Sequence, residues 1–397
     1  MNMREGNRVA LLDVLRGFAS LGILLFNITA FSGWVFLSPK EAAVLPGASM
    51  DAAAMHLIVA LIEDKFYSLF SLLFGVGFAI MVGRAQQNDA QPTPILLRRY
   101  FVLLCIGLLH TTLIWFGDIL VLYALLGLVL LACRGLSERA LVRCAIVLLL
   151  LPIPLYGLGL LVQPAAPAGG AMPPELLAAI QAFKSGSYSQ IVAGNVAVTE
   201  FGWLRRLILM FYPRVFGMFL LGVVLSRMGI FQAPERHGRL FRVFSRSGLL
   251  IGLPASILYS ALDQHTGMLP LTANGFLRTV CESIGAPLLC LGYVAWITML
   301  FKSPTGSRWL LWLAPVGRTA LSNYLLQSLV GVLLFYGIGG GWFMSVSLAT
   351  ALALALLIYA VQVLLSRLYC RFFKQGPVEN VWRRLTYGVT PSGRWAR

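Results

Sequence analysis

The chain has 397 residues, of which 58% are hydrophobic and only 12% are charged, whereas soluble domains carry about 25% charged residues. This composition excludes an ordinary soluble enzyme, and a transmembrane β-barrel is excluded because the apolar runs are continuous rather than alternating. The formal net charge of +16 fits an excess of Lys and Arg on cytoplasmic loops better than a nucleic-acid partner.

Apolar runs near the length of a membrane span, about 20 residues, recur from end to end. They predict an all-α, polytopic integral membrane protein with about ten transmembrane helices in a single membrane domain, 1–397. The distribution of Lys and Arg predicts that both termini are cytoplasmic (N-in, C-in), together with the loops 84–98, 134–142 and 227–246. The predicted spans lie near 9–30, 66–83, 99–116, 118–133, 143–162, 207–226, 247–263, 280–300, 318–337 and 343–366.

The first span contains the stretch RGFASLGILLFN, residues 16–27. Arg16 and Asn27 are eleven residues apart, which on a helix places them on one face about 16 Å from each other. Asp13 and Ser20 lie near that face, so a polar stripe is predicted. Two interpretations are open: a functional cation and amide, or a snorkelling Arg16 held by Asp13 with Asn27 in an interhelical hydrogen bond.

Residues 52–65 are predicted to lie at the outer interface, before the second span. This segment ends in Glu63, Asp64 and Lys65. Ionisable groups at membrane depth are candidates for a functional site. Asp64 is therefore a candidate, with neutralisation of Lys65 as the simpler alternative.

His110 is the one histidine of four that falls well inside a predicted span. A buried neutral imidazole can serve as a general base, or it can be a structural link between helices. As a base it should face a water-accessible cavity and have a carboxylate or carbonyl near one ring nitrogen. Asp64 is the preferred partner, because Asp118 lies about 12 Å further along an unbroken helix and reaches His110 only if Gly117 breaks that helix.

The longest predicted extramembrane segment is 163–205, an external loop with one short helix that begins at PPELLAAIQAF and could cover an external opening. In the ninth span, Asn323 and Gln327 follow Arg318 at the i,i+4 spacing of one polar face, either as part of a site or as interhelical links. Residues 367–397 are predicted to be a basic cytoplasmic tail that lies on the inner leaflet.

The candidate residues divide between the two sides of the membrane. A guanidinium presents a rigid fork to phosphate, so the inner helix ends are candidates for a phosphorylated cytoplasmic donor. That donor-binding set is Arg16, Arg98, Arg99, Arg318, Asn323 and Gln327. The candidate catalytic set in the outer half is Asn27, Asp64, His110 and Asp118. No metal site is expected, because none of the six cysteines forms a CxxC pair.

Several motifs resemble the YeiB-like family, domain-of-unknown-function family 418, across nearly the whole chain. They are LLDVLRGFASLGILLFNI, DKFYSLFSLLFGVGFA, LLHTTLIWFGDILVLYALLGL, GRTALSNYLLQS and GPVENVWRRLTYG. That family is similar to the transmembrane acyltransferase superfamily, which includes the acyltransferase-3 proteins and heparan-α-glucosaminide N-acetyltransferase. Those proteins use cytoplasmic acyl-CoA to acylate a sugar on the far side of the membrane.

The acyltransferase-3 motif has an arginine or lysine, ten further residues and then a histidine in the first span. Here the spacing from Arg16 holds, but Asn27 stands where that histidine is expected. The heparan enzyme is more similar in this respect, since it also has an asparagine there. His110 as the replacement base is our own hypothesis and is not implied by the resemblance.

The leading hypothesis is a membrane acyltransferase with acyl-CoA, acetyl-CoA as first choice, as donor substrate. The acceptor is a small molecule or a glycan, the other expected partners are membrane lipids, and a homo-oligomer is left open. The expected location is the bacterial cytoplasmic (inner) membrane, with multiple passes. The alternatives are a transporter or lipid/small-molecule-binding protein without catalysis, and a purely structural membrane protein.

Overall fold

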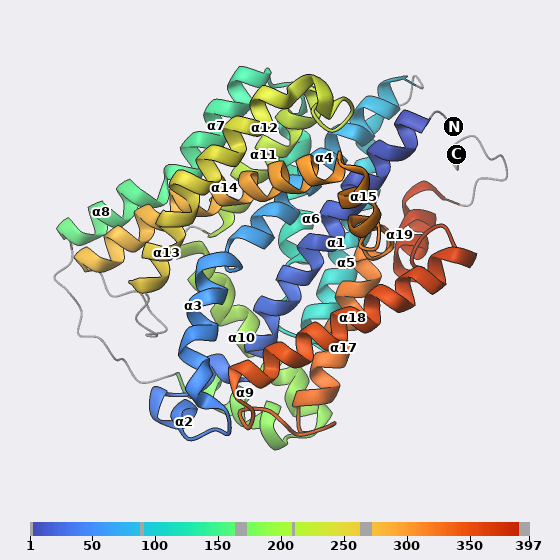
Figure 1. Ribbon diagram of the computed structural model, residues 1–397. Coiled ribbons are helices and arrows are strands. Elements are labelled where there is room, and N and C mark those ends of the chain that lie inside the picture. The colour runs from blue at the N-terminus through green and yellow to red at the C-terminus, as the bar shows by residue number, and fades with distance from the viewer. Residues whose placement is uncertain (1–2, 88–90, 163–172, 209–210, 263–271, 389–397) are drawn as a thin grey trace.

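The computed structural model describes residues 3–87, 91–162, 173–208, 211–262 and 272–388. Within these ranges every regular element is helical, as the continuous apolar runs predict. Figure 1 shows a bundle of tilted helices with α1 passing through its middle. The helices of the first half are α1 (Met3–Phe31), α2 (Pro39–Ala43), α3 (Asp51–Leu61), α4 (Lys65–Gln87), α5 (Pro92–Leu113), α6 (Leu120–Ala132), α7 (Glu138–Leu150), α8 (Pro152–Val162) and α9 (Pro174–Ser185).

The second half continues in the same style, with one π-helical turn (Gly248–Gly252) between α12 and α13. Its helices are α10 (Tyr188–Ile208), α11 (Phe211–Arg227), α12 (Gly238–Ser247), α13 (Leu253–Ala261), α14 (Ala273–Phe301), α15 (Pro304–Leu310), α16 (Ala314–Arg318), α17 (Ala320–Phe335), α18 (Leu348–Phe372) and α19 (Pro377–Tyr387).

The described helices bear out a multi-pass membrane protein. Seven segments are long and apolar enough to cross a bilayer: Ala10–Phe31, Ala48–Gln87, Pro92–Leu113, Glu138–Val162, Pro234–Ala261, Ala273–Phe301 and Leu348–Phe372. Two shorter apolar helices, Leu120–Gly135 and Ala320–Phe335, coincide with two further predicted spans. The predicted span 207–226 corresponds to α11, which has 17 residues. The segment 52–65, expected at the interface, belongs mainly to α3, which leads into α4.

Helix α1 is the centre of the packing. It contacts α4, α16, α17 and α18, and Leu15 and Ala19 are fully buried in its inner face. The closest approach is to α16, where a Cβ on Gly317 would meet the carbonyl oxygen of Asp13 at 1.7 Å. Only glycine fits this crossing, and it is what brings Arg318 close to the polar stripe of α1.

The segment 163–205 differs from its prediction where the structure describes it. The expected short helix is present as α9, with proline in its first turn. The residues after it form a second helix, α10, over Tyr188–Ile208, where a loop was expected. Phe183 of α9 is fully buried and stacks on Phe116 and Tyr336, with ring centroids 5.5 Å and 4.8 Å away. Together α9 and α10 cover one end of the bundle, here named the α9 end (Figure 1).

Helix α19, in the C-terminal segment, docks on the opposite end of the bundle, here named the α19 end. Glu379 of α19 accepts hydrogen bonds from the backbone N–H groups of Leu321 and Ser322, at 2.7 Å and 3.1 Å, and so caps the start of α17. The Trp382 indole donates to the carbonyl oxygen of Arg99 at 2.9 Å. These contacts join α19 to α17 and α5.

Candidate functional site

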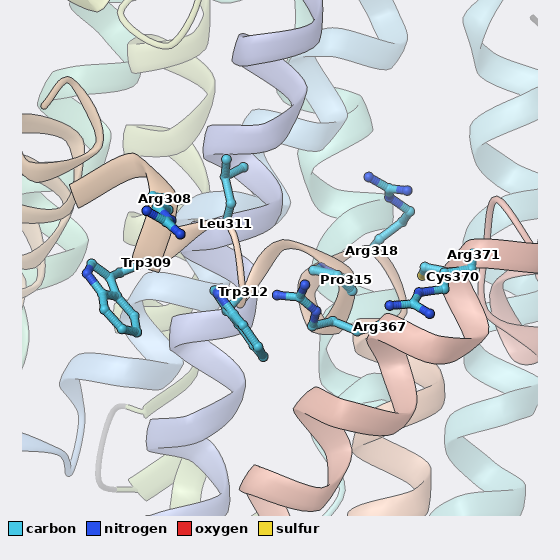
Figure 2. Close-up of a pocket in the computed structure, with 9 residues that line it drawn as sticks. All are labelled: Arg308, Trp309, Leu311, Trp312, Pro315, Arg318, Arg367, Cys370 and Arg371. Atoms are coloured by element: carbon cyan, nitrogen blue, oxygen red, sulfur yellow. The ribbon is translucent and has the colours of Figure 1, made fainter. Parts of the chain in front are cut away.

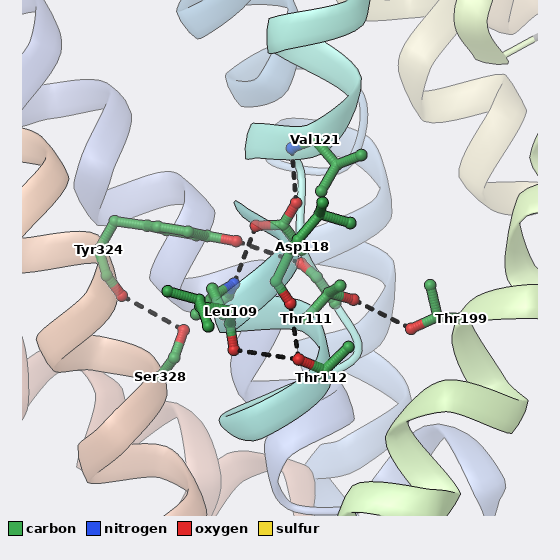
Figure 3. Close-up of polar contacts among 11 residues, drawn as sticks. Leu109, Thr111, Thr112, Asp118, Val121, Thr199, Tyr324 and Ser328 are labelled. Atoms are coloured by element: carbon green, nitrogen blue, oxygen red, sulfur yellow. Dashed lines mark hydrogen bonds and ion pairs between the residues drawn. The ribbon is translucent and has the colours of Figure 1, made fainter. Parts of the chain in front are cut away.

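The α5–α6 hairpin brings His110 and Asp118 together. Helix α5 ends at Leu113, the chain turns, and α6 begins at Leu120. His110 Nδ1 lies 2.9 Å from Asp118 Oδ1, and both side chains are buried. The turn depends on Gly117, where a Cβ would meet the Trp115 ring at 2.1 Å. Figure 3 shows Asp118 at the start of α6, facing the end of α5.

The expected partner of His110 was therefore wrong. Asp118, the second choice, takes the place predicted for Asp64, because α5 ends at Leu113 and the chain turns through Gly117, the break on which the Asp118 pairing depended. The second oxygen of Asp118 accepts the backbone N–H of Val121 at 2.8 Å. This bond caps the first turn of α6 and fixes the carboxylate in place.

His110 is held at one ring nitrogen and free at the other. When Nδ1 donates its proton to Asp118, Nε2 carries the lone pair of the neutral imidazole. Nε2 is buried and has no hydrogen-bond partner among the described residues. Buried polar atoms are normally hydrogen-bonded, and Nε2 shares its lack of a partner among the described residues with atoms such as Ser256 Oγ and Ser283 Oγ. The arrangement is that of a general base with its orienting carboxylate.

The expected water access to His110 is not found. Its side chain is only 1% exposed. The ring centroids of Tyr324 and Trp115 lie 5.1 Å and 6.5 Å from its own. The Tyr324 hydroxyl donates to the carbonyl oxygen of Gly117 at 3.3 Å, which ties α17 to the hairpin. Trp115 and Tyr324 therefore help to enclose the imidazole, while its neighbours Leu108, Leu109 and Leu113 on α5 are exposed on the surface of the bundle.

Asn27 is in the last part of α1. It is half-buried and is one helical turn before Phe31, on nearly the same face. The Phe31 ring stacks on Trp115 with centroids 4.1 Å apart, and Trp115 contacts His110. Phe31 of α1 and His110 of α5 thus approach Trp115 from two helices, and Asn27 is placed near them only through its helical spacing from Phe31.

Helix α10 adds polar groups that the sequence interpretation missed. Asn195 is fully buried, and its amide donates to the carbonyl oxygen of Thr112 at 3.2 Å. Its Oδ1 has no hydrogen-bond partner among the described residues. Thr199 bonds Thr111 at 3.0 Å. The signal was available, because Asn195 and Thr199 are four residues apart and share a face once the segment is recognised as a helix.

Asp64 belongs to a second polar cluster, between α4, α11 and α14. It has a positive φ of 64° at the break before α4, and its Oδ2 lacks a hydrogen-bond partner in the described part of the chain. Lys65 is fully buried and donates to the carbonyl oxygen of Val59 at 2.7 Å. The centre of the cluster is a buried ion pair between Arg214 and Glu282. Glu282 was missed as a candidate, because one carboxylate within an apolar run gives no indication of its partner.

At the α19 end, Asp13 lies between two arginines. Its carboxylate contacts Arg16 at 3.1 Å and Arg318 at 3.6 Å. The pairing of Arg16 with Asp13 was one of the two interpretations left open. Arg98 is exposed, and the Arg99 guanidinium lies 3.6 Å from the centre of the Trp382 ring. The structure therefore brings together Arg16 and Arg318 at Asp13, while Arg99 stacks on Trp382.

Asn323 and Gln327 form interhelical links. The Asn323 amide donates to Thr319 and Ser366, at 2.8 Å and 3.0 Å. Gln327 donates to Ser20 and Gln362, at 3.2 Å and 2.9 Å. Their side-chain amides thus connect α17 to α1 and α18, which is the structural alternative for both residues. No cluster of three potential metal ligands occurs among the described residues.

Bacterial proteins are similar in sequence to this chain over nearly its whole length. A family model described as "Protein of unknown function (DUF418)" matches residues 225–389. "Uncharacterized protein YxaH" of Bacillus subtilis is 33% identical, over 96% of this chain and 94% of the relative. "Uncharacterized protein YeiB" of Escherichia coli is 30% identical, over 94% of this chain and 95% of the relative. Neither relative's name states an activity.

Proposed function

The chain belongs to the YeiB-like family of DUF418 proteins, and we propose that it is a membrane acyltransferase. The donor is a cytoplasmic acyl-CoA, and the acceptor is an extracytoplasmic or membrane-held hydroxyl or amine, such as that of a sugar or lipid-linked glycan. The membrane is the bacterial cytoplasmic membrane. The observation that carries the proposal is the buried His110, oriented at Nδ1 by Asp118 and without a hydrogen-bond partner at Nε2 among the described residues.

In the proposed reaction, His110 Nε2 accepts the proton of the acceptor hydroxyl or amine as its oxygen or nitrogen attacks the thioester carbonyl carbon. The tetrahedral oxyanion then collapses, the carbon–sulfur bond breaks, and the CoA thiolate leaves with the proton from the imidazolium. Asp118 keeps the ring oriented and stabilises its positive charge. The Asn27 amide donates a hydrogen bond to the oxyanion.

The enclosure of His110 sets a requirement for this reaction. Trp115 and Tyr324 must move aside, or the α9–α10 cover must shift, before an acceptor reaches Nε2. An enclosed site also excludes water, and so protects the thioester from hydrolysis. We propose that the enclosed arrangement is the resting state and that donor and acceptor binding opens it.

The donor end of the reaction is proposed at the α19 end, where Arg16 and Arg318 share Asp13. Two guanidinium groups against one carboxylate leave a net positive charge, which suits a phosphate. Asn323 and Gln327 have no direct donor contact in this proposal. They stabilise the α1–α17–α18 contacts that keep the donor and acceptor regions in register.

The proposal is tested in proteoliposomes that contain the purified protein, radiolabelled acetyl-CoA and a membrane glycan extract. Transfer of label should fall by about 10²–10⁴-fold in His110→Ala, the usual contribution of a general base. His110→Asn keeps a hydrogen-bonding group but no base, and should be equally inactive. The matched control is His56→Asn, because His56 bonds Ser260 on the opposite flank of the bundle. Full transfer by His110→Asn would contradict the assignment.

A second candidate, a transporter without catalysis, is favoured by the buried Arg214–Glu282 pair, since charged groups at membrane depth often mark a substrate pathway. The same proteoliposomes distinguish the two functions. Movement of a labelled glycan across the membrane with no release of CoA thiol would support transport. Release of CoA that depends on acceptor would support acyl transfer.

A further inference from the structure

A basic pocket of about 760 Å³ opens at the α19 end, between α15, α16 and the last turns of α18. Figure 2 shows its side chains as an elongated row rather than a ring. The lining residues are Arg308, Trp309, Leu311, Trp312, Pro315, Arg318, Arg367, Cys370 and Arg371. Four are arginines and none is acidic. One of them is Arg318, which connects this pocket to the Arg16–Asp13 contact.

The aromatic lining of the pocket is exposed. Trp309 and Trp312 are 70% and 39% exposed, and the Arg367 guanidinium lies 3.5 Å from the centre of the Trp312 ring. A stacked guanidinium is held flat, so that its N–H groups are presented at the edge as a preformed fork. An aromatic face beside such a fork suits a ligand that carries both a flat ring and phosphate.

We infer that this pocket binds the nucleotide part of the acyl donor, with its phosphates against Arg318, Arg367 and Arg371 and its base on the exposed tryptophans. The identity of the ligand rests on the proposed function. The charges are complementary, because a phosphate monoester carries about −1.5 to −2 and the pocket is lined by four arginines, of which Arg318 also contacts Asp13. The row of side chains in Figure 2 suits an extended ligand, which enters with its thioester end towards α1.

Three arginines of the pocket gain a proposed role in donor binding. Among the arginines of the pocket, Arg308, Arg367 and Arg371 were not in the donor-binding set from the sequence, whereas Arg98 and Arg99 were and do not line it. The phosphate of an anionic lipid headgroup has the same chemistry, and the exposed Trp309 would also suit a membrane interface. The experiment must therefore separate a soluble nucleotide from a lipid.

Cys370 supplies the readout, because it lines the pocket and is half-buried. In a Cys144→Ser background, which removes the one fully exposed cysteine among the described residues, the rate of maleimide labelling at Cys370 is followed by mass spectrometry. The protein is in neutral detergent, and the probe is acetyl-CoA, which has no free thiol. Saturating acetyl-CoA should slow labelling by at least about fivefold.

Substitutions of Arg367 test whether the protection of Cys370 depends on contacts between an arginine and the phosphates of the donor. Arg367→Ala should raise the half-protecting concentration of acetyl-CoA about tenfold, since one hydrogen bond to a charged group contributes at least that. Arg367→Lys should lie between it and the parent protein, because the charge stays while the fork is lost. The matched control is Arg242→Ala, an exposed arginine in a separate basic patch on α12, which should leave the protection unchanged.

The outcomes separate the pocket from the reaction. No protection by acetyl-CoA, or equal protection in Arg367→Ala, overturns the inference. Protection by phosphatidylglycerol micelles that acetyl-CoA does not displace also overturns it, and identifies a lipid site. If acetyl-CoA protects Cys370 but no acceptor is acylated, the pocket stands and the acyltransferase proposal fails. If Arg367→Ala transfers acyl groups with an unchanged KM for acetyl-CoA, the pocket fails and the acyltransferase proposal stands.

Discussion

Two buried polar regions of this protein differ in how completely their hydrogen bonds are made. In the α1–α17–α18 region, the amides of Asn323 and Gln327 bond to groups on neighbouring helices. In the α5–α6 region, His110 has one nitrogen on Asp118 and the other without a partner among the described residues. The two regions meet at Tyr324, which is on α17 and packs against the His110 ring.

Whether a buried polar side chain makes all its hydrogen bonds distinguishes a structural role from a candidate chemical role better than its residue type does. A buried polar group that is fully bonded stabilises helix contacts, whereas one left without a partner costs free energy and is retained only where something else requires it. Both regions looked equally functional in the sequence, since each placed polar residues at membrane depth. The hydrogen bonds distinguish the two regions. The loss of stability that a substitution causes in each region, compared with the loss in the second polar cluster, tests this distinction.

The largest loss of stability is expected at the buried Arg214–Glu282 pair, in the second polar cluster between α4, α11 and α14. Glu282→Ala leaves Arg214 beside Asp64 without its main carboxylate. Removing one partner of a buried ion pair costs about 3–5 kcal/mol. Unfolding in mixed micelles should show this loss in the free energy of unfolding.

The double variant Arg214→Met/Glu282→Leu is the control for that prediction. It removes both charges and should recover most of the lost stability, because no unpaired charge stays buried. If the double variant is as unstable as Glu282→Ala while both still fold, the pair matters through its shape rather than its charge. Loss of transport or transfer in a stable double variant would instead give this cluster a functional role.

A smaller loss is expected where the amides are satisfied. Gln327→Leu removes the donor that joins Ser20 on α1 to Gln362 on α18, and should lower the free energy of unfolding by about 1–2 kcal/mol. Ser328→Ala is the matched control in the same helix, since among the described residues the Ser328 hydroxyl bonds only the Tyr324 carbonyl of its own helix, at 3.3 Å. Equal losses in the two variants would show that Gln327 does not link the helices.

Much of the fold was predictable, because hydrophobicity alone decides which segments enter a membrane. Each predicted span contains a helix, and the Pro174 start of α9 followed from its sequence. A break between the third and fourth spans at residue 117 was predicted, but the end of α5 at Leu113, three residues before the predicted end of that span, was not. Gly117 was the signal, but its need became visible only with the Trp115 ring packed against it.

The candidate site was predictable in its members but not in its pairing. His110 and Asp118 were both named, yet their contact depends on a turn rather than on helix spacing. Glu282 and Arg214 are far apart in the sequence, so no local pattern could pair them. The docking of α19 was equally invisible, because Glu379 and Trp382 have their partners on α17 and α5. Long-range contacts decide these features, and helical periodicity does not encode them.

The smallest change of stability is expected in Asp118→Asn, with one of the largest changes of activity. The side-chain oxygen of Asn accepts hydrogen bonds as the carboxylate of Asp does, so Asn should keep the bond from the Val121 N–H and alter the free energy of unfolding by less than about 1 kcal/mol. The neutral amide no longer stabilises a positive imidazolium at His110. Its NH₂ group can donate to Nδ1, and the imidazole proton then sits on Nε2, which removes the lone pair that acts as the base. Acyl transfer should therefore fall towards the level of His110→Ala.

The control for Asp118→Asn is Asp118→Ala, which loses both the cap and the carboxylate and should be less stable by about 1 kcal/mol. Unfolding curves and transfer rates of the two variants, measured on the same preparations, separate the two roles of this side chain. Equal stability loss in both would mean that the charge, rather than the cap, holds the α5–α6 turn. Undiminished transfer in Asp118→Asn would show that His110 acts without an orienting carboxylate, and would leave Asp118 as the cap of α6.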